Sequence, residues 1–173
     1  SVLGQAFHND QEKYILMQDT FETYYLALVF GLFAIASIFI LPFMKLYTAG
    51  ADINYIDYKL PILFGAYHLL TYGRTSANLI ISFAGKFKET QWRAWLETII
   101  NLAVSFACVF RFGIYGVLFG TIAALLYRAN DIIIYANKIV LKRSPWPTYR
   151  RWLINAGIFA VSVFLFVRMP LRL

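Results

Sequence analysis

The sequence has little charge and almost no cysteine. Charged residues make up 14% of its 173 residues and hydrophobic residues 60%, which is far from the composition of a soluble domain of this length. The single cysteine, Cys108, excludes an internal disulfide, and no metal-ligand spacing surrounds it. We therefore expect Cys108 to be a small packing residue, and we predict neither a metal ion nor another cofactor.

Signatures of catalysis are missing as well. The sequence contains no GxSxG, no HExxH, no glycine-rich phosphate loop and no Cys/His cluster. It also has no pair of carboxylates within one apolar run, which a membrane hydrolase or glycosyltransferase would need. We predict that the protein is not an enzyme.

The apolar residues are gathered in five blocks. A helix needs about 20 residues to cross roughly 30 Å of hydrocarbon, and the first, second and fourth blocks meet this length alone. The third and fifth blocks meet it together with flanking Trp and Arg residues. The sequence therefore predicts an all-α fold, a polytopic transmembrane helical bundle of about five spans. The predicted spans are 23–44, 60–84, 93–111, 114–139 and 151–168.

The two ends of the sequence are predicted to be short segments outside this bundle. Residues 1–22 form a polar arm with scattered apolar residues, which we predict to be an interfacial helix that leads into the first span. Pro42 is predicted to end that span, and residues 168–173 are predicted to be a short tail. We expect the sequence to be a fragment that lacks spans on both sides, because five spans that start inside would leave the C-terminus outside.

The net charge of +7 is concentrated in alternate loops. Loops 85–93 and 138–151 are basic, whereas the turn 48–58 carries Asp52 and Asp57, which balance the flanking Lys45 and Lys59. The positive-inside rule then places both basic loops in the cytoplasm and the turn 48–58 outside. We attribute the basic excess to membrane topology and predict no nucleic-acid partner.

Polar residues follow one side of the second predicted span. They recur at spacings of three and four, as on one helix face: His68, Thr71, Thr75, Asn78 and Ser82. Arg74 lies beside this stripe, near the middle of the span. A charge at the bilayer centre costs roughly 2.5–3.5 kcal/mol on insertion scales, so Arg74 is predicted to face protein or a water-filled cavity. The stripe is then either a substrate path or a polar seam that only joins helices.

The third and fourth spans carry polar stripes too. On the third they are Glu97, Asn101, Ser105 and Cys108, and on the fourth Gly120, Ala124, Arg128 and Asp131. Gly116 and Gly120 form a small-xxx-small pattern that allows close helix approach. Arg128 is either neutralised by Asp131 three residues later or faces the cavity, with Asp131 adjusting its environment. The counter-charge of Arg74 is either Glu97 or the anion of a ligand.

Several stretches appear in an order and spacing typical of one family. They are AGKFKETQ at 84–91, ETIINL at 97–102 and FGIYGVLFGT at 112–121, with PFMKLYT at 42–48 and LYR at 126–128. Over most of residues 21–151, the sequence resembles the C-terminal half of polysaccharide-type flippases of the multidrug/oligosaccharidyl-lipid/polysaccharide exporter superfamily. No single stretch is diagnostic, and the resemblance depends on all of them together.

The resemblance implies a fold and an activity. Members of this family have twelve to fourteen spans in two pseudo-symmetric lobes. They move undecaprenyl-pyrophosphate-linked sugars across the bacterial cytoplasmic membrane, by alternating access of the two lobes. This chain would be the later part of the second lobe. Its partners would be the lipid-linked oligosaccharide, membrane lipids and the missing N-terminal lobe.

We can then assign expected roles to the polar residues. Arg74 and Arg128 would bind the pyrophosphate, because a guanidinium group binds phosphate oxygens in a bidentate manner and stays charged. Glu97 and Asp131 are candidates for coupling to a Na⁺ or H⁺ gradient. The expected hydrogen-bonding partners of the sugar are Thr71, Tyr72, Thr75, Asn78 and Asn101.

Two other functions compete with this prediction. An exporter of small amphipathic cations in the same superfamily would need a net acidic cavity, whereas the predicted spans hold two deep arginines. A membrane scaffold subunit without transport activity would use the same polar stripes only to pack helices together.

Overall fold

The computed structural model of the protein describes residues 2–49, 57 and 59–168, and the elements in this part of the chain are helices without any strand. They are α1 (Val2–Asn9), α2 (Gln11–Tyr47), α3 (Lys59–Gly73), α4 (Thr75–Phe83), α5 (Phe87–Phe112), α6 (Ile114–Ile134), the π-helix η1 (Tyr135–Val140) and α7 (Trp146–Arg168). The predicted all-α class is confirmed.

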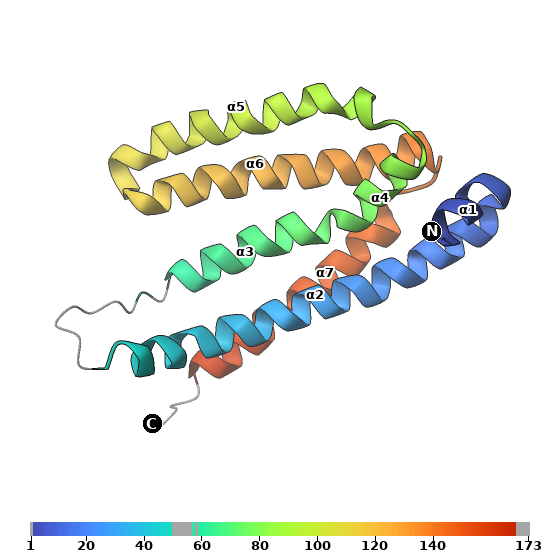
Figure 1. The fold of residues 1–173 in the computed structure, drawn as a ribbon. Helices are drawn as coiled ribbons and strands as arrows, with labels where there is room; N and C mark the ends of the chain where they lie inside the picture. The colour runs from blue at the N-terminus through green and yellow to red at the C-terminus, as the bar shows by residue number, and fades with distance from the viewer. Residues whose placement is uncertain (1, 50–56, 58, 169–173) are drawn as a thin grey trace.

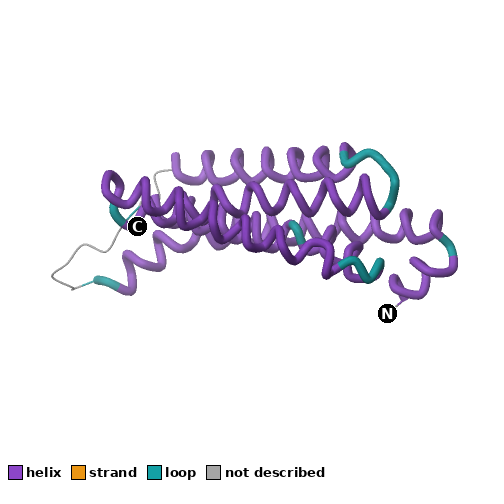
Figure 2. Tube along the Cα trace, turned by 90° about the horizontal axis from the view of Figure 1, so that it is seen from above, coloured by secondary structure: helices purple, strands orange, loops and turns teal. Residues whose placement is uncertain are grey.

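The long helices lie side by side in an elongated bundle (Figures 1 and 2). α5 packs along α6, α6 contacts α3, α3 contacts α2, and α2 contacts α7. Of the long helices, α5 is at the edge of the bundle, because its contacts are mainly with α6. One core cluster joins α2, α4, α6 and η1, and a second joins α2 and α3, with Trp152 of α7 packed against both.

Three of the described helical segments are long and apolar enough to cross a membrane: Gln11–Tyr47, Phe87–Phe112 and Ile114–Val140. α2 also exposes large apolar side chains on its outer face, where Leu28 is 60% and Phe39 61% exposed. Exposed apolar surface of this extent is unusual for a soluble monomer. Together these features indicate a membrane protein.

The first predicted span, 23–44, is the middle part of α2. The helix already begins at Gln11, where the side chain of Asp10 accepts a hydrogen bond from the backbone N–H of Lys13 (3.0 Å). More than half of the predicted arm therefore belongs to α2. The prediction that Pro42 ends the span is wrong, because α2 continues through Pro42 to Tyr47. Proline is tolerated inside helices in an apolar environment, where the neighbouring backbone hydrogen bonds have no competing water.

The second predicted span, 60–84, is interrupted at Arg74. α3 ends just before this residue and α4 begins just after it, while Arg74 itself has a ψ of −6°. Packing explains why glycine precedes the interruption: a Cβ on Gly73 would collide with the indole ring of Trp152 from α7. The prediction of one continuous polar stripe on a single helix is therefore wrong, because its members are divided between α3 and α4.

The two predicted basic loops are shorter than expected. Loop 85–93 contracts to a tight turn in which Gly85 has a φ of +67°, and α5 begins two residues later. Loop 138–151 contracts to residues 141–145, because η1 continues α6 and α7 starts at Trp146.

Other predicted segments are only partly within the described residues. Of the predicted turn 48–58, residues 50–56 and 58 lie outside them, and so do residues 169–173 of the predicted tail. Asp57 is described, and it accepts hydrogen bonds from the Tyr115 hydroxyl and from the backbone N–H of Lys59 (2.8 Å). The hydrogen bond from Tyr115 lowers the pKa of Asp57.

α5 and α6 form a hairpin with a very close helix contact. The chain turns at Gly113, whose φ of +57° favours glycine. A Cβ on Gly116 would lie 2.6 Å from the backbone nitrogen of Val109, and one on Gly120 would lie 2.6 Å from that of Ser105. The close approach predicted from Gly116 and Gly120 is thus confirmed.

Replacement of Gly116 by alanine should separate the two helices of this hairpin. The added methyl group meets backbone atoms that cannot move aside, so we expect Gly116→Ala to lower the stability by about 1–3 kcal/mol. Thermal unfolding of the purified protein in detergent micelles measures this effect. The control is Gly157→Ala in α7, where no atom lies within 4 Å of the new Cβ, and it should leave the melting temperature unchanged or raise it. Equal losses in the two variants would contradict the hairpin geometry.

Candidate functional site

Three arginines and two carboxylates form a continuous chain of ion pairs between the α3–α4 junction, α5 and α6. Four of the five residues come from the two hairpin helices. In order along the chain of contacts, this arginine cluster consists of Arg74, Glu97, Arg128, Asp131 and Arg93.

Arg74 reaches the cluster from the interruption between α3 and α4. Its Nη1 lies 3.2 Å from Oε1 of Glu97, and the two side chains are 18% and 24% exposed. The sequence analysis offered Glu97 or the anion of a ligand as the counter-charge of Arg74. In the structure, Arg74 is paired with Glu97. Arg74 directly follows Gly73, whose backbone packs against the indole ring of Trp152. This contact helps to position Arg74 at the α3–α4 junction.

Arg128 lies at the centre of the cluster and touches both carboxylates. Its Nη1 is 3.0 Å from Oδ2 of Asp131, which is the neutralising pair that the spacing of three suggested. Its Nε is 3.6 Å from Oε2 of Glu97, and its Nη2 donates to the backbone carbonyl of Thr90 (3.4 Å). The Arg128 side chain is only 11% exposed. Arg128 is therefore both neutralised within its own helix and linked to α5.

Arg93 completes the cluster and was missed by the sequence analysis, which counted it among the loop cations. It is paired with Asp131, and its guanidinium carbon lies 5.0 Å from the ring centre of Tyr135. Its Nε is buried and has no hydrogen-bond partner in the described part of the chain. The sequence spacing could have identified Arg93 as a member of the cluster, because Arg93 precedes Glu97 by four residues and extends the polar stripe of α5 by one turn.

The cluster contains one more positive charge than negative charges. Glu97 bridges Arg74 and Arg128, and Asp131 bridges Arg128 and Arg93. An approaching Na⁺ ion or proton would meet three fixed guanidinium groups. The arrangement therefore favours an anionic ligand, and it disfavours the predicted use of Glu97 and Asp131 for ion coupling.

The residues predicted to bind sugar are spread over several places. Asn101 lies in the α5–α6 seam, where its side-chain oxygen accepts hydrogen bonds from Ser105 (3.0 Å) and Thr121 (3.5 Å). The hydroxyl of Thr71 donates to a backbone carbonyl in its own helix (2.8 Å). Tyr72 is 46% exposed and stacks on Phe33 of α2 with ring centres 5.9 Å apart.

Thr75 and Asn78 follow Arg74 within the next four residues of the chain. Both are half-buried on α4, and neither side chain forms a hydrogen bond among the described residues. These two side chains are thus free to hydrogen-bond a ligand, whereas the side-chain oxygen of Asn101 already accepts hydrogen bonds from its neighbours.

A groove of about 400 Å³ lies between α2 and α3, and it is largely apolar. Of the predicted polar stripe, His68 is the member that lines it, and the described lining does not include Arg74. His68 is stacked on Phe33 with ring centres 5.0 Å apart. This groove is therefore not lined by the whole stripe, and the predicted substrate cavity stays a prediction.

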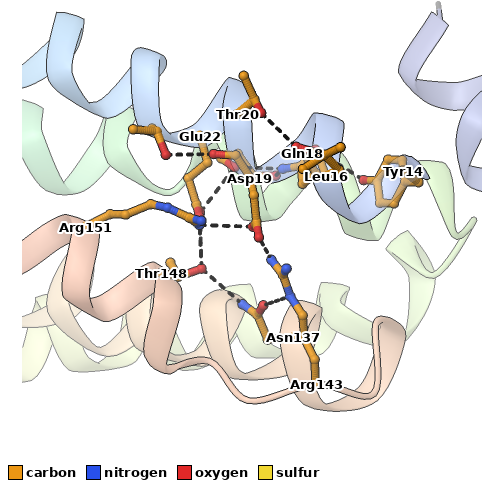
Figure 3. A network of polar contacts seen from close by, with 12 residues as sticks. Tyr14, Leu16, Gln18, Asp19, Thr20, Glu22, Asn137, Arg143, Thr148 and Arg151 are labelled. Atoms are coloured by element: carbon orange, nitrogen blue, oxygen red, sulfur yellow. Dashed lines mark hydrogen bonds and ion pairs between the residues drawn. The ribbon is translucent and has the colours of Figure 1, made fainter. Parts of the chain in front are cut away.

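A second polar network joins α2 to α4, η1 and α7 (Figure 3). Its side chains come from four elements and the loop before α7, and most of them are fully buried. This α2–α7 network consists of Gln18, Asp19, Glu22, Ser76, Asn137, Arg143, Thr148 and Arg151.

Glu22 is the buried centre of this network. Its side chain is 4% exposed, forms an ion pair with Arg151 and accepts hydrogen bonds from Thr148 (3.1 and 3.2 Å) and Ser76 (3.3 Å). Asp19, one turn before it, pairs with Arg151 (3.0 Å) and Arg143 (2.9 Å). Two arginines thus meet two carboxylates, and the network is neutral.

The sequence analysis missed the α2–α7 network because it treated Arg143 and Arg151 as loop cations with no acid nearby. Their acids lie on α2, more than a hundred residues earlier in the chain. A local signal was nevertheless present, because the polar residues Tyr14, Gln18 and Glu22 recur every four residues and so occupy one face of α2.

No family model, curated protein or solved structure matches this chain. The described residues also contain no group of three or more His, Cys, Asp or Glu side chains that is able to hold a metal ion. The geometry and charge of the arginine cluster, together with the resemblance described above, are therefore the basis for a functional interpretation.

Removal of the Glu22 carboxylate should destabilise the bundle strongly. Glu22→Ala leaves a buried gap beside Thr148 and leaves Arg151 with Asp19 as its carboxylate partner, so we expect a loss toward the lower end of the about 3–5 kcal/mol that breaking a buried ion pair costs. We expect Glu22→Ala to unfold at a much lower temperature in detergent, and Glu22→Gln to show an intermediate loss. The matched control is Glu12→Ala, an exposed position at the start of the same helix, which should melt like the wild type. Wild-type stability of Glu22→Ala would show that the network contributes little.

Proposed function

We propose that this chain belongs to a transporter that moves an undecaprenyl-pyrophosphate-linked oligosaccharide across the bacterial cytoplasmic membrane for cell-surface polysaccharide synthesis. In this proposal the chain supplies about five spans of the second lobe of a flippase that works by alternating access. α3 and α4 cross the membrane together, since with 15 and 9 residues neither is long enough alone. The resemblance over residues 21–151 supports this assignment.

One observation carries the proposal: the two ionic networks differ in their balance of charge. The α2–α7 network pairs two arginines with two carboxylates, as expected of side chains that only hold helices together. The arginine cluster sets three arginines against two carboxylates, and the hairpin that provides most of it is made of helices long enough to cross a membrane. An excess positive charge in that environment is expensive unless an anion approaches it.

The pyrophosphate group fits this excess charge. Glu97 uses one carboxylate oxygen for Arg74 (3.2 Å) and the other for Arg128 (3.6 Å), so that one anionic group already bridges the two cations. A pyrophosphate offers more acceptor oxygens and more charge than a carboxylate, and guanidinium groups bind phosphate oxygens in a bidentate manner. In our proposal, the pyrophosphate displaces Glu97 from Arg74 and Arg128 when the substrate binds.

The exposure of the side chains supports this exchange. Arg74 and Glu97 are 18% and 24% exposed, whereas Glu22 of the α2–α7 network is 4% exposed. A ligand can therefore approach the Arg74–Glu97 pair more easily than the buried pair. Thr75 and Asn78 on α4 are positioned to bind the first sugar, and we no longer assign Asn101 to it because its hydrogen bonds are made within the hairpin.

Replacement of Arg74 is the test of this function. In the full-length transporter, Arg74→Ala should abolish glycan export with membrane abundance largely intact, because the pyrophosphate loses the more exposed of the two arginines that Glu97 bridges. Arg74→Lys should retain part of the activity, since it keeps the charge but loses the bidentate contact. Export is measured as the amount of polymer that reaches the cell surface, beside an immunoblot of the membrane fraction.

The control for this test is Arg111→Ala. Arg111 is an exposed arginine at the other end of α5, and its loss removes the same charge without touching the cluster. It should export normally. Normal export by Arg74→Ala, or a loss that only follows reduced abundance, would favour the scaffold function, in which the cluster joins helices and binds no substrate.

A further inference from the structure

The basic side chains at the end of the bundle where α5 and α7 begin fall into two classes. The arginines with carboxylate partners are largely buried, with side chains 11–26% exposed: Arg74, Arg93, Arg128, Arg143 and Arg151. The exposed cations form no ion pair among the described residues: Lys88, Lys138, Lys142 and Arg150. These four residues are called the basic rim below. Their charge is not used by the fold.

Contacts between neighbouring residues place the basic rim around one end of the bundle. The Tyr135 hydroxyl donates to Glu89, which brings the first turn of α5, with Lys88, to η1, with Lys138. Arg143 donates to Asn137 (2.9 Å), which brings the loop that contains Lys142 back to η1. Figure 1 shows the start of α5, the end of α6 and the loop before α7 at the same end.

Large, exposed aromatic side chains lie near these cations in the sequence, and they indicate that this end of the bundle lies at the level of the lipid headgroups. Phe87, directly before Lys88, is 67% exposed, and Trp146 at the start of α7 is 62% exposed. Exposed Trp92 and Trp95 follow within the first turns of α5 (57% and 70%). Tryptophan beside basic residues at the ends of membrane-spanning helices is typical of the level of the lipid headgroups.

The carboxylates near the basic rim are already occupied. Glu89 accepts a hydrogen bond from Tyr135 and pairs with Lys86 (3.6 Å), and Asp131 is held between two arginines. Asp10 and Glu12 lie apart, at the corner between α1 and α2. Because these carboxylates are engaged or distant, the rim cations are free to bind an anion from outside the protein.

We propose that the basic rim binds the headgroups of anionic phospholipids in the adjacent leaflet. The phosphodiester of such a lipid lies at the level of the exposed tryptophans, where each Lys or Arg attracts it over the short range that salt screening permits. Membrane topology alone requires only that these residues be positively charged. Lipid binding requires in addition that they be exposed and without protein partners, as they are here. This inference does not depend on the transported substrate.

Quenching of tryptophan fluorescence by brominated lipids tests the proposal, because three of the four tryptophans lie at this end. The purified chain is reconstituted into phosphatidylcholine vesicles with an equal mole fraction of brominated phosphatidylglycerol or brominated phosphatidylcholine. We expect the brominated phosphatidylglycerol to associate at least about twofold more strongly, because several cations act together. High salt should remove the preference for the wild type, a result that depends on no variant.

Two matched variants locate the lipid site. The rim variant Lys88→Gln, Lys138→Gln and Lys142→Gln should lose the preference for phosphatidylglycerol. The control Lys45→Gln, Lys59→Gln and Arg111→Gln removes the same charge at the opposite end and should retain it. Equal quenching by the two brominated lipids with the wild type, or an unchanged preference in the rim variant, would overturn the proposal. Equal quenching with the wild type would mean that the basic rim serves only to set the membrane topology.

Discussion

An arginine withdrawn from water needs a carboxylate, and in this protein that carboxylate usually comes from another helix. The α3–α4 junction is tied to α5 through Arg74 and Glu97, and α7 is tied to α2 through Arg151 and Glu22. To leave either charge unpaired in a dry environment would cost several kcal/mol. The arrangement of the helices therefore depends on where these few charges meet, while the apolar side chains fill the space between them.

The two ionic networks have different consequences for mechanism. The α2–α7 network is neutral and has the buried Glu22 at its centre, so it holds its helices together without a further ion. The arginine cluster has an excess positive charge, and in our proposal an incoming anion replaces Glu97 as the partner of Arg74 and Arg128. Such a site is consistent with the proposed alternating access, in which two lobes move around a fixed substrate site.

Local sequence patterns predicted the features that depend on local spacing. The all-helical class, the Gly116–Gly120 contact and the Arg128–Asp131 pair all follow from helical periodicity. The interruption at Arg74 did not, and neither did the requirement for glycine before it, which depends on an indole ring from α7. The partners of Arg143 and Arg151 were missed for the same reason: their acids on α2 are distant in sequence, and a basic loop has the same composition whether or not acids reach it.

The central claim is that Arg74 binds the substrate anion and does not only pair with Glu97. A charge swap separates these roles, because Arg74→Glu combined with Glu97→Arg restores the ion pair with its ends reversed. The measurement is surface glycan export, normalised to membrane abundance, for each single variant and for the double variant. The swap also removes the contact between Glu97 and Arg128, so our account predicts that the double variant accumulates better than Glu97→Arg alone yet does not export, since the cation has left the α3–α4 junction. Restored export in the double variant would contradict it.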